Sequence, residues 1–235
     1  MQESGDKSGR LIVVEGIDGS GKKTQARLLA EWMHARGLRV MGLAFPQYGK
    51  KSAGPVEEYL NGKYGDADLL SPYAASLLFA VDRFDAAHAI RELLADGVVV
   101  LLDRYVDSNA GHQGGKFRSE KKRIEFLRWL YRIEYELLGI PRPNLTILLH
   151  VPFEISYQLV GKKQQRLYIE RGIRDSHEGN LEHLKRAQQA YLWLAERDPK
   201  RYRLIDCIEN DELLSASEIH ERVKSAVRDT LELLM

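Results

Sequence analysis

The chain has 235 residues, 44% of them hydrophobic, and its 35 Lys plus Arg nearly balance its 34 Asp plus Glu. A chain of this size buries a substantial core as one large domain. Its net charge of +1 gives no reason to expect a basic surface that binds polymeric nucleic acid. The lone Cys207 excludes an internal disulfide framework, and the seven histidines lack metal-ligand spacing. Residues 1–9 lack the apolar centre of a signal peptide, and no later run reaches the ~18 apolar residues of a membrane span. We therefore expect a flexible tail over residues 1–9 and a single cytoplasmic domain over residues 10–235.

The first predicted strand, residues 11–14, leads through a glycine-rich loop into a helix expected over residues 24–36. Gly16, Gly21 and Lys22 have the G-x-x-x-x-G-K spacing, in which backbone N–H groups converge on phosphate oxygens and the lysine reaches the outer phosphates. The following helix adds its N-terminal dipole. A glycine-rich turn without a ligand has no use for Lys22, and a dinucleotide fingerprint requires a third glycine where Thr24 stands.

We therefore predict a phosphate-binding loop whose nucleotide contacts come from Gly16, Gly19, Ser20, Gly21, Lys22, Lys23 and Thr24. Lys23 departs from the pattern, because a Ser or Thr hydroxyl for magnesium is expected at that position. The loop by itself leaves metal binding open.

The second predicted strand, residues 40–44, runs into an aromatic loop that contains Phe45 and Tyr48. Ligands of open α/β sheets bind beyond the carboxyl ends of the strands, so both residues are candidates for a pocket. The alternative is a loop packed on its own aromatic side chains. A short helix is expected over residues 55–60, and a long one from residue 72 to about residue 96. Asp82 and Arg83 interrupt the apolar stripe of the long helix, as a solvated face, an internal ion pair or a ligand site would.

The third predicted strand, residues 98–102, is an unbroken apolar run that delivers Asp103 and Arg104 at its carboxyl end. An acid next to the phosphate loop can hold magnesium directly or through water, and an arginine there can bind a phosphate with two hydrogen bonds. A strand-end ion pair is the structural alternative. The polar, glycine-ended segment 107–115 that follows is suited to lining a sugar pocket.

The rest of the chain continues the alternation of helices and strands. Helices are expected over residues 119–138, 153–160, 181–196 and 216–234, and strands over residues 145–151 and 202–206. Between them, residues 161–178 are rich in Lys and Arg without an apolar period, as in a solvated charge run or a lid that closes over a transferred phosphoryl group. The order of elements predicts an α/β fold with a five-stranded parallel sheet flanked by helices on both faces.

Five motifs occur in the same order as in a known family: the phosphate loop with Asp18, Phe45-Pro46, residues 78–83, Asp103-Arg104-Tyr105, and Ser108 with Gln113. With these motifs the chain resembles the thymidylate kinase family of P-loop nucleoside monophosphate kinases, over nearly its whole length. The resemblance implies an enzyme that transfers the γ-phosphoryl group of ATP to dTMP with Mg²⁺ and makes dTDP for dTTP synthesis. It also implies a homodimer with small-molecule substrates.

The resemblance implies roles for individual residues. Asp18 would contact the nucleotide 3′-hydroxyl and lie near the metal, Phe79 would stack on thymine, and Arg83 would meet thymine O4. Arg104 would bind the acceptor phosphate, Asp103 would sit at the metal, and Tyr48 would lie near both. The remaining substrate contacts would come from Phe45, Ser108, Asn109, His112 and Gln113.

The family places its catalytic arginine either in the phosphate loop, after the acid, or in the lid. Gly19 follows Asp18 here, so the lid would supply the catalytic arginine. The candidates are Arg166, Arg171 and Arg174. Two residues depart from the family pattern. His112 stands where many relatives carry a tyrosine near the 2′ position of the sugar, and Lys23 replaces the usual hydroxyl, as a basic residue does in some bacterial relatives.

Three other functions compete with this interpretation. A kinase for another deoxynucleoside monophosphate, or for deoxynucleosides, would differ in its preferred acceptor. A nucleotide-binding regulatory module without catalysis is favoured by Lys23 and opposed by Asp18, Arg83, Asp103 and Arg104. A polynucleotide-binding ATPase is disfavoured by the charge balance.

Overall fold

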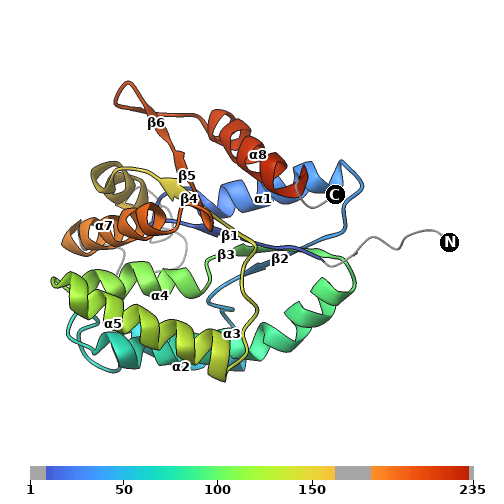
Figure 1. Ribbon diagram of the computed structural model, residues 1–235. Helices are drawn as coiled ribbons and strands as arrows, with labels where there is room; N and C mark the ends of the chain where they lie inside the picture. Colours follow the sequence, from blue (N-terminus) through green and yellow to red (C-terminus); the bar gives the residue numbers. More distant parts are fainter. Residues whose placement is uncertain (1–8, 162–180, 233–235) are drawn as a thin grey trace.

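The computed structural model describes residues 9–161 and 181–232, and within them a five-stranded parallel sheet forms the centre of the molecule (Figure 1). The strands lie in the order β2-β3-β1-β4-β5. Their bounds are β1 Leu11–Glu15, β2 Val40–Ala44, β3 Val99–Asp103, β4 Leu145–His150 and β5 Tyr202–Asp206. The central strand β1 is buried along its whole length, as expected for a parallel strand covered on both faces. The predicted fold class and all five predicted strands are confirmed.

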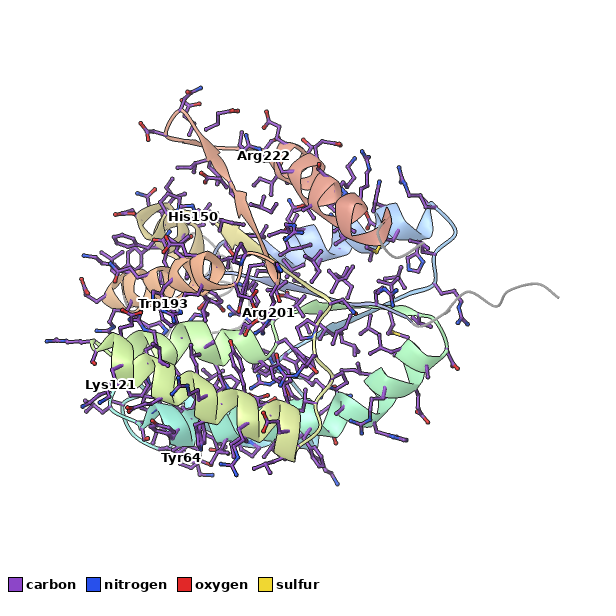
Figure 2. All side chains as sticks on the ribbon, in the orientation of Figure 1. Tyr64, Lys121, His150, Trp193, Arg201 and Arg222 are labelled. Carbon is purple, nitrogen blue, oxygen red and sulfur yellow. The ribbon has the colours of Figure 1, made fainter. Side chains whose placement is uncertain are left out.

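Two layers of helices cover the sheet (Figure 1). One face carries α1 (Lys22–His34) and α8 (Ala216–Glu232), and the other carries α3 (Pro72–Ala95), α4 (Val106–His112), α5 (Glu120–Tyr131) and α7 (Leu181–Arg197). Alternate residues of β1 enter the two apolar clusters: Leu11 and Val13 pack toward α3 and α7, and Ile12 and Val14 pack toward α1 and α8. Figure 2 shows side chains filling both layers.

The predicted helices are present, with ends displaced by a few residues. They include α2 (Gly54–Leu60) and a helix over residues 153–161. The helix expected over residues 119–138 divides into α5 and a π-helical segment, η3 (Arg132–Leu137), in which Leu138 N–H donates to Ile133 O across five residues at 2.9 Å. Short 3₁₀ turns, η1 (Lys51–Ala53) and η2 (Gly114–Lys116), and a hairpin of β6 (Ile208–Glu209) and β7 (Glu212–Leu213) complete the described part.

Helix α4 was not expected, because residues 107–115 were predicted only as a polar pocket-lining segment. Its apolar stripe is interrupted by buried polar side chains, which form hydrogen bonds inside the fold instead of contacting solvent. Asp107 is 2% exposed and accepts hydrogen bonds from Arg201 at 2.5 and 2.7 Å and from the Tyr131 hydroxyl at 3.0 Å. The helix is therefore stabilised by tertiary contacts that a periodicity analysis does not detect.

Two of the predicted segments lie mainly outside the described residues. Of the predicted lid, residues 161–178, the structure describes only Gly161. The three predicted lid arginines, Arg166, Arg171 and Arg174, lie outside the described residues. Of the predicted tail, only Gly9 is described, and its N–H donates to Leu94 O. No helix in residues 9–161 and 181–232 has the length and apolar character needed to cross a bilayer.

Candidate active site

The glycine-rich loop lies at the carboxyl end of β1, between β3 and β4. Gly16, Gly19 and Gly21 have φ values of 145°, 84° and 87°, which other residues rarely adopt. A Cβ atom on Gly16 would lie 2.7 Å from Leu149 O, and one on Gly19 would lie 2.5 Å from Ser156 O. The loop therefore turns tightly against β4 and the helix over residues 153–161. It places the start of α1 beyond the carboxyl ends of the strands, a position suited to binding an anion.

Lys22 is buried in this loop and its Nζ donates to Ile17 O at 2.7 Å. Burial and the charge of Arg104 together lower the pKa of Lys22 to about 8, against the opposing effect of Asp18. Ser20 is 3% exposed, and its hydroxyl has no hydrogen-bond partner among the described residues. Lys23 and Thr24, in contrast, are exposed. Lys22 therefore closes the loop, whereas Lys23 extends toward solvent.

Arg104 begins the segment that leaves β3 and lies opposite the loop. Its φ of 69° is in the left-handed region, and its N–H donates to Val14 O at 3.1 Å. Its guanidinium is paired with the carboxylate of Asp18. Burial opposes the charge of Asp18, but the cation of Arg104 outweighs burial, so the pKa of Asp18 lies below its usual range. The same pairing raises the pKa of Arg104 despite burial.

A chain of two histidines continues from Arg104. Arg104 Nη1 lies 3.2 Å from His112 Nε2, His112 Nδ1 lies 3.0 Å from His183 Nε2, and His183 Nδ1 lies 3.4 Å from Asp68 Oδ1. A guanidinium only donates, so His112 must accept at Nε2 and carry its proton at Nδ1. Burial first, and the charges of Arg104, His183 and Lys22 after it, place the pKa of His112 well below its usual range although Asp18 opposes them. His112 is therefore a neutral acceptor that orients Arg104.

Asp103 differs from Asp18, the other predicted metal carboxylate, in having a buried carboxylate oxygen without a partner among the described residues. Its Oδ1 is buried and has no hydrogen-bond partner among the described residues, whereas Asp18 is paired with Arg104. No group of three or more His, Cys, Asp or Glu within residues 9–161 and 181–232 could enclose a metal. One carboxylate suits Mg²⁺, which keeps several waters and takes other ligands from substrate phosphates.

Glu15, the residue before the loop, is a buried carboxylate that sequence reasoning missed. It accepts hydrogen bonds of 2.8 Å from Tyr105 N–H, the Ser108 hydroxyl and the Tyr191 hydroxyl. Burial and the nearby Asp107 raise its pKa. The predicted sugar-pocket residue Ser108 thus directs its hydroxyl to Glu15. An acid that ends an otherwise apolar strand, directly before Gly16, is the signal that would have identified it.

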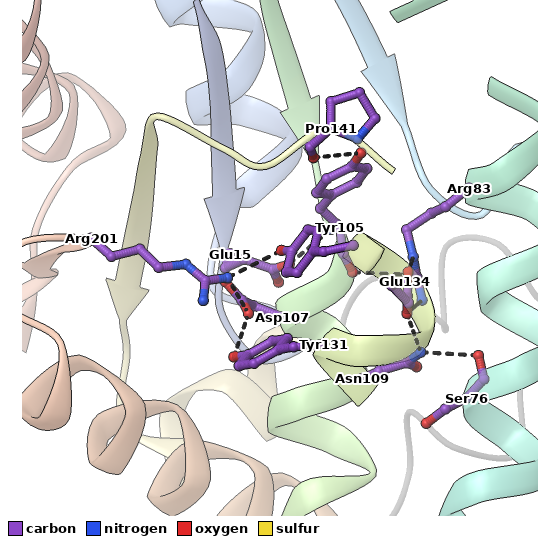
Figure 3. Close-up of polar contacts among 11 residues, drawn as sticks. Glu15, Ser76, Arg83, Tyr105, Asp107, Asn109, Tyr131, Glu134, Pro141 and Arg201 are labelled. Atoms are coloured by element: carbon purple, nitrogen blue, oxygen red, sulfur yellow. Dashed lines mark hydrogen bonds and ion pairs between the residues drawn. The ribbon is translucent and has the colours of Figure 1, made fainter. Parts of the chain in front are cut away.

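A second polar cluster joins α3, α4 and η3 (Figure 3). Arg83 Nε and Nη2 donate to the two carboxylate oxygens of Glu134 at 2.6 and 2.5 Å, and Arg83 Nη1 donates to Tyr105 O at 3.3 Å. Asn109 Nδ2 bridges Ser76 O at 3.2 Å and Glu134 Oε1 at 3.3 Å. The structure therefore shows Arg83, one of the two charged residues that interrupt the α3 stripe, in an internal ion pair, and sequence reasoning had not identified Glu134 as its partner.

The other predicted substrate contacts differ in burial and in the rings that they meet. Phe79 is half-buried and meets Tyr59 edge-on, with ring centroids 6.0 Å apart. Gln113 is buried, and its Oε1 has no hydrogen-bond partner among the described residues. Phe45 is 4% exposed and packs on Tyr105, whereas Tyr48 is 62% exposed.

Asp82 holds the aromatic loop against α3. Its Oδ2 accepts the Gln47 N–H at 2.8 Å, and its Oδ1 accepts the Ser52 hydroxyl at 2.8 Å. The two charged residues in the α3 stripe therefore differ in function: Asp82 anchors a loop, and Arg83 is paired with η3.

The chain is similar to known proteins in sequence and in fold. The family model described as thymidylate kinase matches residues 14–218. The chain is 38% identical over 187 residues to a thymidylate kinase from Mycobacterium tuberculosis (strain ATCC 25618 / H37Rv), covering 79% of this chain and 85% of that one. It is 33% identical over 224 residues to a probable thymidylate kinase from Pyrococcus abyssi, covering 95% and 98%. A solved thymidylate kinase from Candida albicans has the same fold, with a TM-score of 0.72, 23% identity, and coverage of 96% of this chain and 93% of that chain.

Proposed function

The chain belongs to the thymidylate kinase family, and from this membership we propose that it transfers the γ-phosphoryl group of ATP to dTMP, producing dTDP and ADP. It is a nucleoside monophosphate kinase. The observation that carries the proposal is the surroundings of Asp18: Arg104, from the end of β3, is paired with its carboxylate, and the charge of the buried Lys22, from the loop, helps to lower its pKa. Donor and acceptor phosphates need positive charge on both sides of the transferred group.

The reaction requires little covalent chemistry from the protein, so the residues act by positioning and by electrostatic stabilisation. The loop and Lys22 would hold the ATP phosphates. Arg104 would exchange Asp18 for the phosphate of dTMP, because a guanidinium binds phosphate with two parallel hydrogen bonds. Released from Arg104, Asp18 would accept the 3′-hydroxyl of the nucleotide. Phe79 and Arg83 would contact the base.

We assign Mg²⁺ to Asp103, because its buried Oδ1 has no hydrogen-bond partner among the described residues and a carboxylate oxygen suits a hard cation. Bound there, the ion would neutralise charge on the ATP phosphates. The exposed Lys23 cannot ligate a cation and repels it, so the loop supplies a fixed charge instead of a metal ligand. Activity of Asp103→Asn should then require far more magnesium than the parent, whereas Lys23→Ser should bind magnesium-nucleotide as well or better. An Asp103→Asn curve that superimposes on the parent curve would contradict this assignment.

The remaining features of the proposal concern assembly, location and the lid. An exposed apolar stripe on α3, with residues at alternating spacings of three and four, supports a homodimer; its members are Ala74, Leu77, Val81 and Phe84. The single cysteine supports a cytoplasmic location. Arg166, Arg171 or Arg174 would supply the catalytic cation from the lid, and alanine at that position should lower kcat far more than ATP affinity.

The test is ADP release measured over a panel of nucleosides and nucleoside monophosphates. We expect dTMP to give the highest kcat/KM. The preference for dTMP over dUMP in kcat/KM should be modest, because one methyl group in an apolar pocket contributes about 1–3 kcal/mol. If dCMP or a purine monophosphate is the best acceptor, the base assignment is wrong, and if no acceptor increases ADP release, the chain is not a kinase of this kind.

A further inference from the structure

We propose that Glu134 is a specificity-determining positioning residue: it neutralises Arg83 and orients it as a hydrogen-bond donor for the 4-carbonyl of a pyrimidine base. The inference rests on the proposed function, since it concerns recognition of the acceptor nucleotide. Glu134 belongs to neither the phosphate loop nor the residues carried over by the family resemblance. It acts through Arg83.

The contact between the two side chains leaves little freedom to the guanidinium. Their side chains are 1% and 0% exposed, and Nε and Nη2 of Arg83 donate to separate oxygens of Glu134 (Figure 3). Nη1 donates to Tyr105 O. A guanidinium has five N–H groups, so one on Nη1 and one on Nη2 lack an acceptor among the described residues. These two N–H groups are held at a fixed angle and can meet a carbonyl oxygen.

Because Glu134 neutralises Arg83, we expect Arg83 and Arg104 to bind different parts of the acceptor nucleotide. Arg104 pairs with Asp18 where the side chains are 20% and 18% exposed, so its partner can be replaced by an incoming phosphate. Arg83 is paired in a fully buried place, where an uncompensated charge is strongly disfavoured. It therefore remains bound to Glu134 and presents a nearly neutral donor pair. That chemistry fits a base carbonyl and does not attract the acceptor phosphate away from Arg104.

The neighbouring groups point to a nucleobase as the ligand. Ser76, Phe79 and Arg83 are spaced by three and four residues along α3 and so lie near one face. Ser76 is 1% exposed, and its Oγ has no hydrogen-bond partner in the described part of the chain. Asn109 connects Ser76 to Glu134 from α4. An aromatic face flanked by buried donors is the arrangement that recognises a planar base with polar edges.

The backbone around Glu134 is also unusual. Glu134 lies in the π-helical segment η3, where the bond from Leu138 N–H to Ile133 O replaces the α-helical spacing. Such segments are frequent at functional sites. Glu134 and its neighbour Tyr135 are both buried, at 0% and 8% exposure, while Glu136 is exposed. The same segment therefore contains a matched carboxylate that faces solvent.

The experiment compares Glu134→Gln with Glu136→Gln and measures kcat and KM for dTMP, dCMP and ATP. A dCMP base carries an amino donor where dTMP carries the 4-carbonyl, so a fixed Arg83 should reject it. In Glu134→Gln we expect KM for dTMP to rise about tenfold, kcat and KM for ATP to change less than twofold, and the preference for dTMP over dCMP to fall at least tenfold. Glu136→Gln should match the parent. If Glu134→Gln does not fold, Glu134→Asp keeps the charge but withdraws the carboxylate by one methylene, and the same loss of preference is expected.

A double variant tests whether Glu134 acts through Arg83. In an Arg83→Gln background, Glu134→Gln should cause no further loss of the dTMP preference, because the group that Glu134 orients is absent. An equal loss in both backgrounds, or an unchanged preference in folded Glu134→Gln or Glu134→Asp, would overturn the inference. A parent enzyme that phosphorylates no monophosphate would instead refute the proposed function, so the two failures are distinguishable.

Discussion

Arg104 adopts a backbone conformation that is costly for any residue with a side chain. Its φ of 69° lies in the left-handed region, which disfavours a non-glycine residue by about 1–2 kcal/mol. Such a conformation persists where the surrounding structure enforces it, and it is frequent at functional sites. Here it directs the guanidinium to Asp18 and His112. The strain is consistent with the role that we propose for Arg104, which is to bind the acceptor phosphate.

Glycine and alanine at position 104 separate strain from chemistry. Both Arg104→Gly and Arg104→Ala remove the guanidinium, so each should lose about 3–4 kcal/mol of transition-state stabilisation. Only glycine relieves the positive φ, so Arg104→Gly should be more stable than Arg104→Ala by about 1 kcal/mol after its greater unfolded-state entropy is counted. Urea unfolding and kcat/KM measure the two effects. Equal stabilities would show that the backbone is not strained.

His112 should make the stability depend on pH. Its pKa in the folded protein lies well below the usual 6.5, so between that lower value and pH 6.5 the unfolded chain binds more protons. The contribution of His112 is therefore complete above pH 6.5 and is lost as the pH falls below it, at about 1.4 kcal/mol per pH unit at most. In His112→Gln, the glutamine amide oxygen can still accept a hydrogen bond from Arg104. Between pH 7.5 and pH 5.5, the free energy of unfolding of this variant, measured with urea, should fall by about 1 kcal/mol less than that of the parent. Identical losses would contradict a buried, neutral His112.

At the scale of elements, α4 is held against α7 by a close contact of Gly111. A Cβ atom at this position would lie 2.4 Å from the ring of Tyr191, which donates to Glu15. Gly111→Ala should therefore displace Tyr191 and lower the free energy of unfolding by about 1–3 kcal/mol.

Gly54 provides the matched control, because it has helical angles of φ −50° and ψ −49°, and a Cβ atom added to it would meet no neighbouring group within 4 Å. Gly54→Ala should be neutral or more stable by about 0.4–1 kcal/mol. Thermal unfolding of both variants measures the difference. A Gly111→Ala protein as stable as the parent would show that α4 and α7 can separate without cost.

The elements that the sequence predicted well are those with an apolar period. The five strands and the long helices follow from buried runs and from 3.6-residue stripes, and the glycine-rich loop follows from its spacing. Helix α4 was missed because its burial is polar: Asp107, Ser108 and Asn109 each bond to a partner distant in sequence. Glu15 and Glu134 were missed for the same reason, since each acid completes an otherwise apolar element and its partners come from other elements.

For the whole molecule, the exposed stripe on α3 predicts self-association. Leu77, Val81 and Phe84 are 44%, 51% and 52% exposed on one face of the helix. An exposed apolar stripe of this kind is typical of a surface that is covered by a partner. We expect the parent to sediment with the mass of two chains.

A charge placed in the stripe should separate the dimer. Val81→Glu should sediment as one chain, because the carboxylate would be buried without a partner at the interface. Leu213→Glu is the control, since Leu213 is also an exposed apolar residue, 39% exposed, but lies on the β6–β7 hairpin across the sheet from α3 (Figure 1). A monomeric parent, or a dimeric Val81→Glu, would show that α3 is not the contact.

The most direct test of the account follows the phosphoryl group itself. ATP labelled at the γ-phosphate is incubated with magnesium and dTMP, and the products are separated by chromatography. Transfer between two phosphates held by Lys22 and Arg104 predicts label in dTDP with the parent, and a rate lower by about two to three orders of magnitude in folded Lys22→Ala, because a preorganised cation has been removed from the transition state. Label released as inorganic phosphate, with none in dTDP, would contradict it.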